Sequence, residues 1–245
     1  MNYIEAAESQ RNECKQITRD RIPNLGEKLP KCIDELNVLL PLLEGIACCH
    51  WWCPGKNESH VIQRILGKAV SHTLAGLDLT YSGHYDEAMS LARTVGESTN
   101  LTWLFGLDNS LFIEWNSLDG RKRWNKYRPA QVRKKIAALG MPIPIDQDRY
   151  STLSEETTHV NPASRPQTFN SANIPTLGGY LQDAGLMASI NELSPAIAIL
   201  ATNSIKLLPE LPNQKRKDIY DSSLRLLNSV GGVDMSKAVE LRNGA

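Results

Sequence analysis

Apolar side chains recur three and four positions apart through most of the 245-residue chain. This spacing places them along one face of an α-helix, and no stretch shows the alternation of apolar and polar residues that indicates a strand. A chain of this length can bury a sizeable core within one domain. We therefore predict an all-α fold, a single helical bundle that spans residues 1–245.

The clearest predicted unit is an antiparallel helical hairpin over residues 59–115. Ser59 is a suitable N-cap for its first helix, and Ser82-Gly83 supplies a short turn. The second helix then runs from Tyr85 to about Trp115. Two long helices joined by so short a link lie antiparallel, so we expect this hairpin to form the centre of the bundle.

Further helices are predicted on both sides of the hairpin. Two precede it, over residues 1–21 and 25–52. A basic and proline-rich insertion follows over residues 116–175, with short helices after Pro129 and over residues 148–158, and with an extended segment at residues 141–145. The C-terminal helices occupy residues 176–232, and we expect Pro195 to bend or break the first of them.

Composition argues for a soluble cytoplasmic protein. Lysine plus arginine equals aspartate plus glutamate at 27 each, so no net charge steers the chain toward nucleic acid or membrane. The opening residues lack a signal pattern, and the apolar stretch from Leu36 to Cys53 carries a charge and a proline. We therefore expect no membrane partner, and we expect the five cysteines to be reduced.

One local segment departs from this neutrality. Eight cations and no acid lie between Arg121 and Lys135, interleaved with Trp124 and Tyr127. Cations beside exposed aromatic rings are the features that bind phosphates and stack on bases. The predicted binding residues for nucleic acid or a phosphate-bearing ligand are Arg121, Lys122, Arg123, Trp124, Lys126, Arg128, Arg133 and Lys134, with Lys135 adjoining them. The alternative is a solvated segment whose cations pair with acids in residues 78–97 or 108–119.

A second candidate is the cysteine-rich segment Cys48-Cys49-His50-Trp51-Trp52-Cys53, with His60 beyond it. Thiolate and imidazole are zinc ligands, but here they lie in one short run, with no second pair at the spacing of a zinc finger. Free cysteine and tryptophan are also frequent in protein cores. We therefore interpret the segment as a buried helix end and predict no metal site.

A third candidate combines residues that are distant in the sequence. Arg93 and Glu97 lie one helical turn apart, while Tyr150 and His159 bracket a later short helix. If the bundle brings the four together, they form a polar cleft able to perform acid–base catalysis or to hold a phosphate. The alternative is a buried polar network that fixes the register of the helices.

Familiar catalytic templates are missing from the sequence. It contains no phosphate-binding glycine loop, no Gly-x-Ser-x-Gly elbow, no His-Glu-x-x-His and no calcium-binding loop. We therefore predict no cofactor.

The segment from Leu74 to Arg93, with Glu97 beyond it, resembles a hairpin of uncharacterised bacterial helical proteins. Those proteins also carry a Tyr-x-x-Leu-Ser-Glu segment that ends in histidine near Asn-Pro, which corresponds here to Tyr150 to Pro162. The likeness covers about residues 60–165 and implies an all-helical bundle.

These proteins are loosely similar in turn to the HEPN superfamily, many of whose members are RNA-cutting toxins or defence proteins. Nucleases of that superfamily use an arginine followed four to six residues later by a histidine. None of the five histidines in this chain has an arginine at that spacing before it. The resemblance therefore does not carry the nuclease motif.

Three functions follow from these features. The leading hypothesis is a binding or regulatory domain that contacts nucleic acid or a phosphate-bearing ligand through residues 121–135. The rival is a bacterial defence hydrolase or nuclease that uses Arg93, Glu97, Tyr150 and His159. The third is a structural homodimer, with exposed Trp115 and Trp124 at its interface.

Overall fold

The computed structural model describes residues 2–48, 57–157 and 179–230, and within these ranges every regular element is helical. This confirms the all-α prediction. A short 3₁₀ turn, η1 (Ile22–Asn24), separates the first two helices. In chain order the α-helices are α1 (Tyr3–Arg21), α2 (Lys28–Ala47), α3 (Asn57–Tyr81), α4 (Tyr85–Leu107), α5 (Asn109–Ser117), α6 (Gly120–Tyr127), α7 (Pro129–Ala138), α8 (Gln147–Thr157), α9 (Asp183–Leu207) and α10 (Asn213–Ser229).

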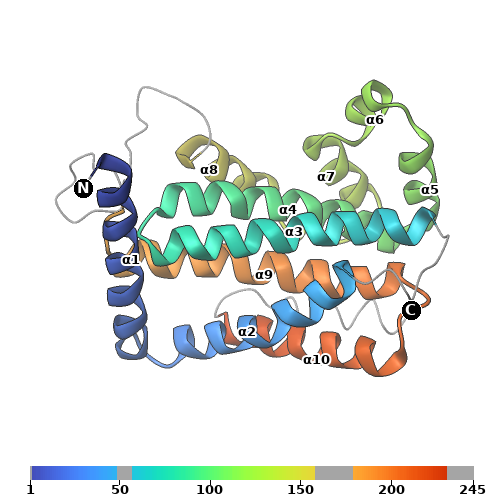
Figure 1. Cartoon of the computed structure of the whole chain (residues 1–245). Coiled ribbons are helices and arrows are strands. Elements are labelled where there is room, and N and C mark those ends of the chain that lie inside the picture. Colours follow the sequence, from blue (N-terminus) through green and yellow to red (C-terminus); the bar gives the residue numbers. More distant parts are fainter. Residues whose placement is uncertain (1, 49–56, 158–178, 231–245) are drawn as a thin grey trace.

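Three long helices, α3, α4 and α9, run side by side through the centre of the molecule (Figure 1). Helices α2 and α10 pack together and cover α9 from the other side. Helix α1 crosses one end of the central helices, and α5, α6 and α7 gather at the opposite end (Figure 1). Helix α8 lies against α4, so α4 is covered by both α7 and α8.

The predicted hairpin is present as α3 and α4, joined by a tight turn at Ser82, Gly83 and His84. Gly83 has φ of +80°, a conformation that side chains with a Cβ rarely adopt. A Cβ at this position would also lie 2.7 Å from the backbone nitrogen of Tyr180. The turn therefore needs glycine both for its backbone angle and for the segment that packs on it.

The second helix of the hairpin is shorter than expected. It ends at Leu107 because Asp108 adopts an extended conformation, with φ of −143° and ψ of 102°. The Asp108 side chain accepts a 2.9 Å hydrogen bond from the backbone N–H of Ser110 and so caps a new helix, α5. The prediction of one helix continuing to Trp115 was therefore wrong, and the polar residues after it form α6.

Pro195 does not break α9, which is a single helix across it. Proline has no N–H, so the carbonyl of Asn191 loses its usual partner within the helix. Arg149 of α8 supplies one: its Nη2 lies 3.4 Å from that carbonyl, while its Nε pairs with Glu192 at 2.6 Å. A side chain from a neighbouring helix thus replaces the missing hydrogen bond.

Helix α9 is the one helix in the described ranges that is long and apolar enough to cross a membrane. Its most apolar window is 72% buried inside the protein, which is the property of a central core helix. Its neighbours α2, α3, α4 and α10 supply this cover.

Candidate functional site

Three of the four residues predicted to form a polar cleft meet between α4 and α8. Arg93 and Glu97 lie one turn apart on α4, with 3.5 Å between Nη1 and Oε1. The Tyr150 hydroxyl accepts a 3.0 Å hydrogen bond from Arg93 Nη1 and donates a 3.0 Å hydrogen bond to Glu97. Ser154, one turn beyond Tyr150, accepts a longer bond of 3.4 Å from Arg93. We call these residues, together with Arg133 described below, the polar cluster.

The segment before α8 fixes its position on α4. Asn100 of α4 binds both backbone groups of Ile145, accepting from its N–H at 3.0 Å and donating to its carbonyl at 2.7 Å. The Ile145 side chain packs where Gly96 leaves room for it. Residues 141–145 run extended, as their prolines predict, and α8 starts two residues later.

Arg133 of α7 completes the polar cluster, which the sequence analysis did not anticipate. It was assigned to the basic binding segment, but its side chain is only 5% exposed. Its guanidinium carbon lies 4.2 Å from the centre of the Tyr150 ring, and its Nη2 donates to Gln147 at 2.6 Å. The helical spacing in the sequence could have indicated that Arg133 is buried, because it lies beside Val132 and one turn before Ile136, the apolar residues of α7 that face the core.

Burial determines the charge states in the polar cluster. It raises the pKa of Tyr150, and the nearby carboxylate of Glu97 raises it further, so the phenol stays neutral and remains a donor. Burial also lowers the pKa of Arg133. Within the described residues, Nη1 of Arg133 and Nε of Arg93 are buried without a hydrogen-bond partner. Two guanidinium donors of the polar cluster are thus unused, although the carboxylates of Glu97 and Asp146 both interact electrostatically with Arg133.

The fourth predicted residue, His159, lies outside the residues that the structure describes. His84 lies elsewhere, at the hairpin turn, where its Nδ1 is 3.1 Å from the Ser82 carbonyl oxygen.

The basic segment forms α6 and α7, anchored by two residues that face inward. Tyr127 is buried, and its hydroxyl contacts the Leu111 carbonyl at 3.1 Å and Glu114 at 2.6 Å. Arg123 lies over the Trp115 ring at 5.0 Å and donates to the Trp115 carbonyl at 2.9 Å. Arg123 therefore holds α6 on α5 instead of facing solvent.

The remaining side chains of α6 point outward. Trp124 is 64% exposed, and exposed cations surround it in the sequence: Arg121, Lys122, Lys126 and Arg128, with Lys134 on α7. Two of these cations are paired, Lys126 with Glu114 and Lys122 with Asp119. Arg121, Arg128 and Lys134 have no ion pair with another described residue. We call Arg121, Lys122, Trp124, Lys126, Arg128 and Lys134 the basic surface.

Arg121 and Trp124 are the most accessible part of the basic surface on α6. They lie three positions apart, so they share one face of the helix. Arg128 directly follows the helix, with an extended backbone, and leads into α7.

The other tryptophan proposed for an interface, Trp115, is half-buried against the core. The Trp115 ring lies 5.4 Å from Phe105 and 6.4 Å from Phe112 between ring centres. It belongs to the edge of the core, so the prediction that it is exposed was wrong.

The cysteine-rich segment falls almost entirely outside the described residues, which include only Cys48 and His60 of its members. Cys48 is exposed at the end of α2. In the described part of the chain, no group of three or more histidine, cysteine or acidic side chains is placed to hold a metal ion.

Comparisons with protein-family models, with curated proteins and with solved structures found no match to this chain.

Proposed function

We propose that this protein binds nucleic acid through the basic surface on α6 and the start of α7. The observation that carries the proposal is the exposed indole of Trp124, with Arg121 one turn earlier on α6 and Arg128 directly after the helix, both exposed. Guanidinium groups bind phosphates, and an exposed aromatic ring stacks on unpaired bases. Single-stranded RNA or DNA is the ligand that uses both.

The position of α6 favours this function. The helix lies toward the end of the molecule opposite α1 and projects away from the central helices (Figure 1). Its inward residues Arg123 and Tyr127 hold it in place, so its outward residues can contact a ligand without disturbing the core. The first acid after Asp119 is Asp146, so the segment itself offers no carboxylate that would repel phosphate.

A titration of the protein with a fluorescent single-stranded oligonucleotide tests the proposal. Binding should weaken steeply between about 50 and 200 mM salt, because each phosphate contact releases counterions. Binding that is undetectable, or that does not change with salt, would rule the proposal out.

The polar cluster favours a second function, hydrolysis of a phosphate ester. The observation is the convergence of Arg93, Glu97 and Tyr150 with two unused guanidinium donors. In this proposal Glu97 accepts a proton from the attacking water, and Arg93 stabilises negative charge on the phosphate. Glu97→Gln should abolish cleavage of a single-stranded oligonucleotide, whereas Glu44→Gln, an exposed change on α2, should not. Equal cleavage by both variants would exclude this function.

We also place the protein in the cytoplasm. The thiols of Cys14, Cys32 and Cys48 are free, which fits a reducing compartment.

A further inference from the structure

A cavity of about 230 Å³ lies between α1 and the turn that joins α3 to α4. None of its described lining residues belongs to the basic surface or to the polar cluster. Helix α1 contributes Gln10, Arg11 and Cys14 to its wall, the turn contributes Ser82 and His84, and Gly179 closes one side.

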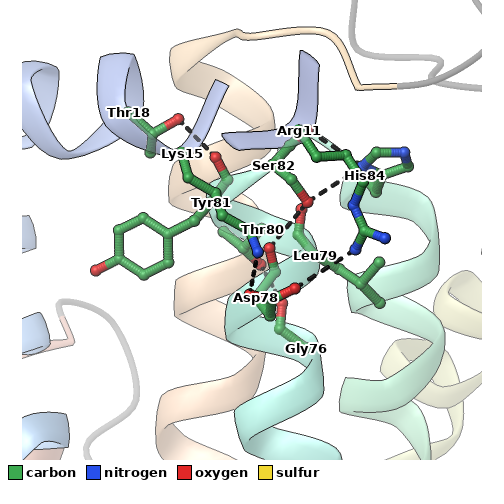
Figure 2. Close-up of polar contacts among 10 residues, drawn as sticks. All are labelled: Arg11, Lys15, Thr18, Gly76, Asp78, Leu79, Thr80, Tyr81, Ser82 and His84. Atoms are coloured by element: carbon green, nitrogen blue, oxygen red, sulfur yellow. Dashed lines mark hydrogen bonds and ion pairs between the residues drawn. The ribbon is translucent and has the colours of Figure 1, made fainter. Parts of the chain in front are cut away.

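Its walls are held in place by contacts that do not depend on a ligand. Thr18 of α1 donates a 2.9 Å hydrogen bond to the Tyr81 carbonyl, and Lys15 pairs with Asp78 at 2.5 Å (Figure 2). On the far side of the turn, the backbone N–H of Tyr180 donates to the Gly83 carbonyl at 3.3 Å. The cavity therefore lies between firmly docked segments.

Arg11 is the charged group of the cavity, and its ion pair is weak. Its Nη2 lies 3.4 Å from Asp78, while Lys15 holds the same carboxylate at 2.5 Å. A guanidinium has five N–H donors, so most of those on Arg11 remain available to a ligand. Figure 2 shows Arg11 and His84 on the same side of the turn.

One of the two ring nitrogens of His84 is already engaged within the protein, which leaves the other for a ligand. Its Nδ1 lies 3.1 Å from the Ser82 carbonyl oxygen, which can only accept, so Nδ1 carries a proton. Nε2 is then the remaining polar atom of the ring. It is therefore the ring atom that can form a hydrogen bond with a ligand oxygen.

The other lining groups are compatible with an anion. None of the described residues that line the cavity is an acid. Burial raises the pKa of Cys14, and nearby Glu13 raises it further, so this thiol stays uncharged at neutral pH. Tyr3 and Ala7 add an apolar wall, which suits a ligand with a carbon skeleton.

We propose that this cavity binds a small organic oxyanion, a carboxylate or phosphate monoester, between Arg11 and His84. Its size limits the ligand to a small molecule, since drug-sized ligands occupy pockets of roughly 300–1,000 Å³. The ligand would bridge α1 and the start of α4, and it would therefore strengthen the docking of α1.

Titration with phenyl phosphate and with benzoate, followed by calorimetry, tests the site and distinguishes the two chemistries. Arg11→Gln should weaken binding of the preferred probe at least about tenfold, the loss of a charged hydrogen bond. A matched control, Arg19→Gln on the same helix, should bind as the wild type does. Absence of binding by both probes, or equal weakening by the control, would overturn the proposal.

Alkylation of the unmodified protein gives a second test that needs no variant. Cys14 lines the cavity, whereas Cys48 is exposed at the end of α2. The bound probe should slow labelling of Cys14 by iodoacetamide and leave labelling of Cys48 unchanged, as read by peptide mass spectrometry. Unchanged labelling of Cys14, or slowing at both cysteines, would contradict the proposed site.

Discussion

The side-chain amide of Asn100 closes two hydrogen bonds with the backbone of Ile145, which lies 45 positions later in the chain. Both residues are buried, so neither backbone group of Ile145 has water as an alternative partner. This contact fixes where α8 begins, and through α8 it brings Tyr150 to Arg93 and Glu97.

Asn100→Ala should destabilise the protein by about 2–4 kcal/mol, because a buried N–H and a buried carbonyl lose their partners together. Urea unfolding followed by circular dichroism measures the change. Asn125→Ala, at an exposed position on α6, is the matched control and should leave stability almost unchanged. If the two variants unfolded at the same urea concentration, Asn100 would not anchor the segment.

Gly96→Ala should destabilise the protein although alanine is the better helix former. An added Cβ would lie 2.8 Å from Cγ1 of Ile145, and the resulting strain costs about 1–3 kcal/mol. Gly45→Ala on α2 is the control, because a Cβ there meets nothing within 4 Å. That change should stabilise the protein by about 0.5–1 kcal/mol. Unfolding free energies that shift in the same direction would refute the close contact at Gly96.

The periodicity of apolar residues was sufficient to predict the helices and the central hairpin, because Gly83 marks the turn unambiguously. It did not reveal the end of α4 at Asp108, since apolar positions continue in register into α5 and only the capping side chain shows the break. Helix α6 was missed for the opposite reason: it has so few apolar residues that its pattern is weak. A break at Pro195, one of the two expected outcomes, does not occur, and the sequence could not show this because the compensating Arg149 comes from another helix.

The site was predictable only in part. The one-turn spacing of Arg93 and Glu97 placed them together, and Tyr150 was expected to join them, which the structure confirms. Arg133 faces inward because of the way α7 is oriented against α4 and α8. The sequence shows Arg133 only as one of eight cations in a predominantly polar segment, so its inward orientation could not be predicted from charge. Arg123 is a similar case: it holds α6 on α5, whereas its neighbours in the sequence are exposed, and their shared charge does not distinguish the two roles.

The attachment of α6 should depend on pH through Glu114. Hydrogen bonds from Lys126 and Tyr127 lower the pKa of this carboxyl. A lowered pKa in the folded state stabilises the protein above the ordinary glutamate pKa, and this stabilisation disappears as the pH falls through the lowered value. Glu114→Gln should therefore be less stable than the wild type at neutral pH and equal to it in strong acid.

Unfolding of both proteins across the acid range measures this difference. Glu44→Gln, at an exposed position on α2, serves as a control away from α6, and its difference from the wild type should not follow the same profile. If Glu114→Gln differed from the wild type by the same unfolding free energy at every pH, Glu114 would not act through its charge.

The most direct test of the central claim is the salt dependence of oligonucleotide binding by Arg121→Gln/Arg128→Gln, compared with Lys217→Gln. Lys217 is an exposed cation on α10, paired with Asp221, and its loss removes one charge away from α6. The double variant should bind more weakly, and the magnitude of the slope of log affinity against log salt should fall by about 1.4, the contribution of two phosphate contacts on a single strand. The Lys217 variant should keep the wild-type slope. Identical slopes for all three proteins would contradict nucleic-acid binding by the basic surface.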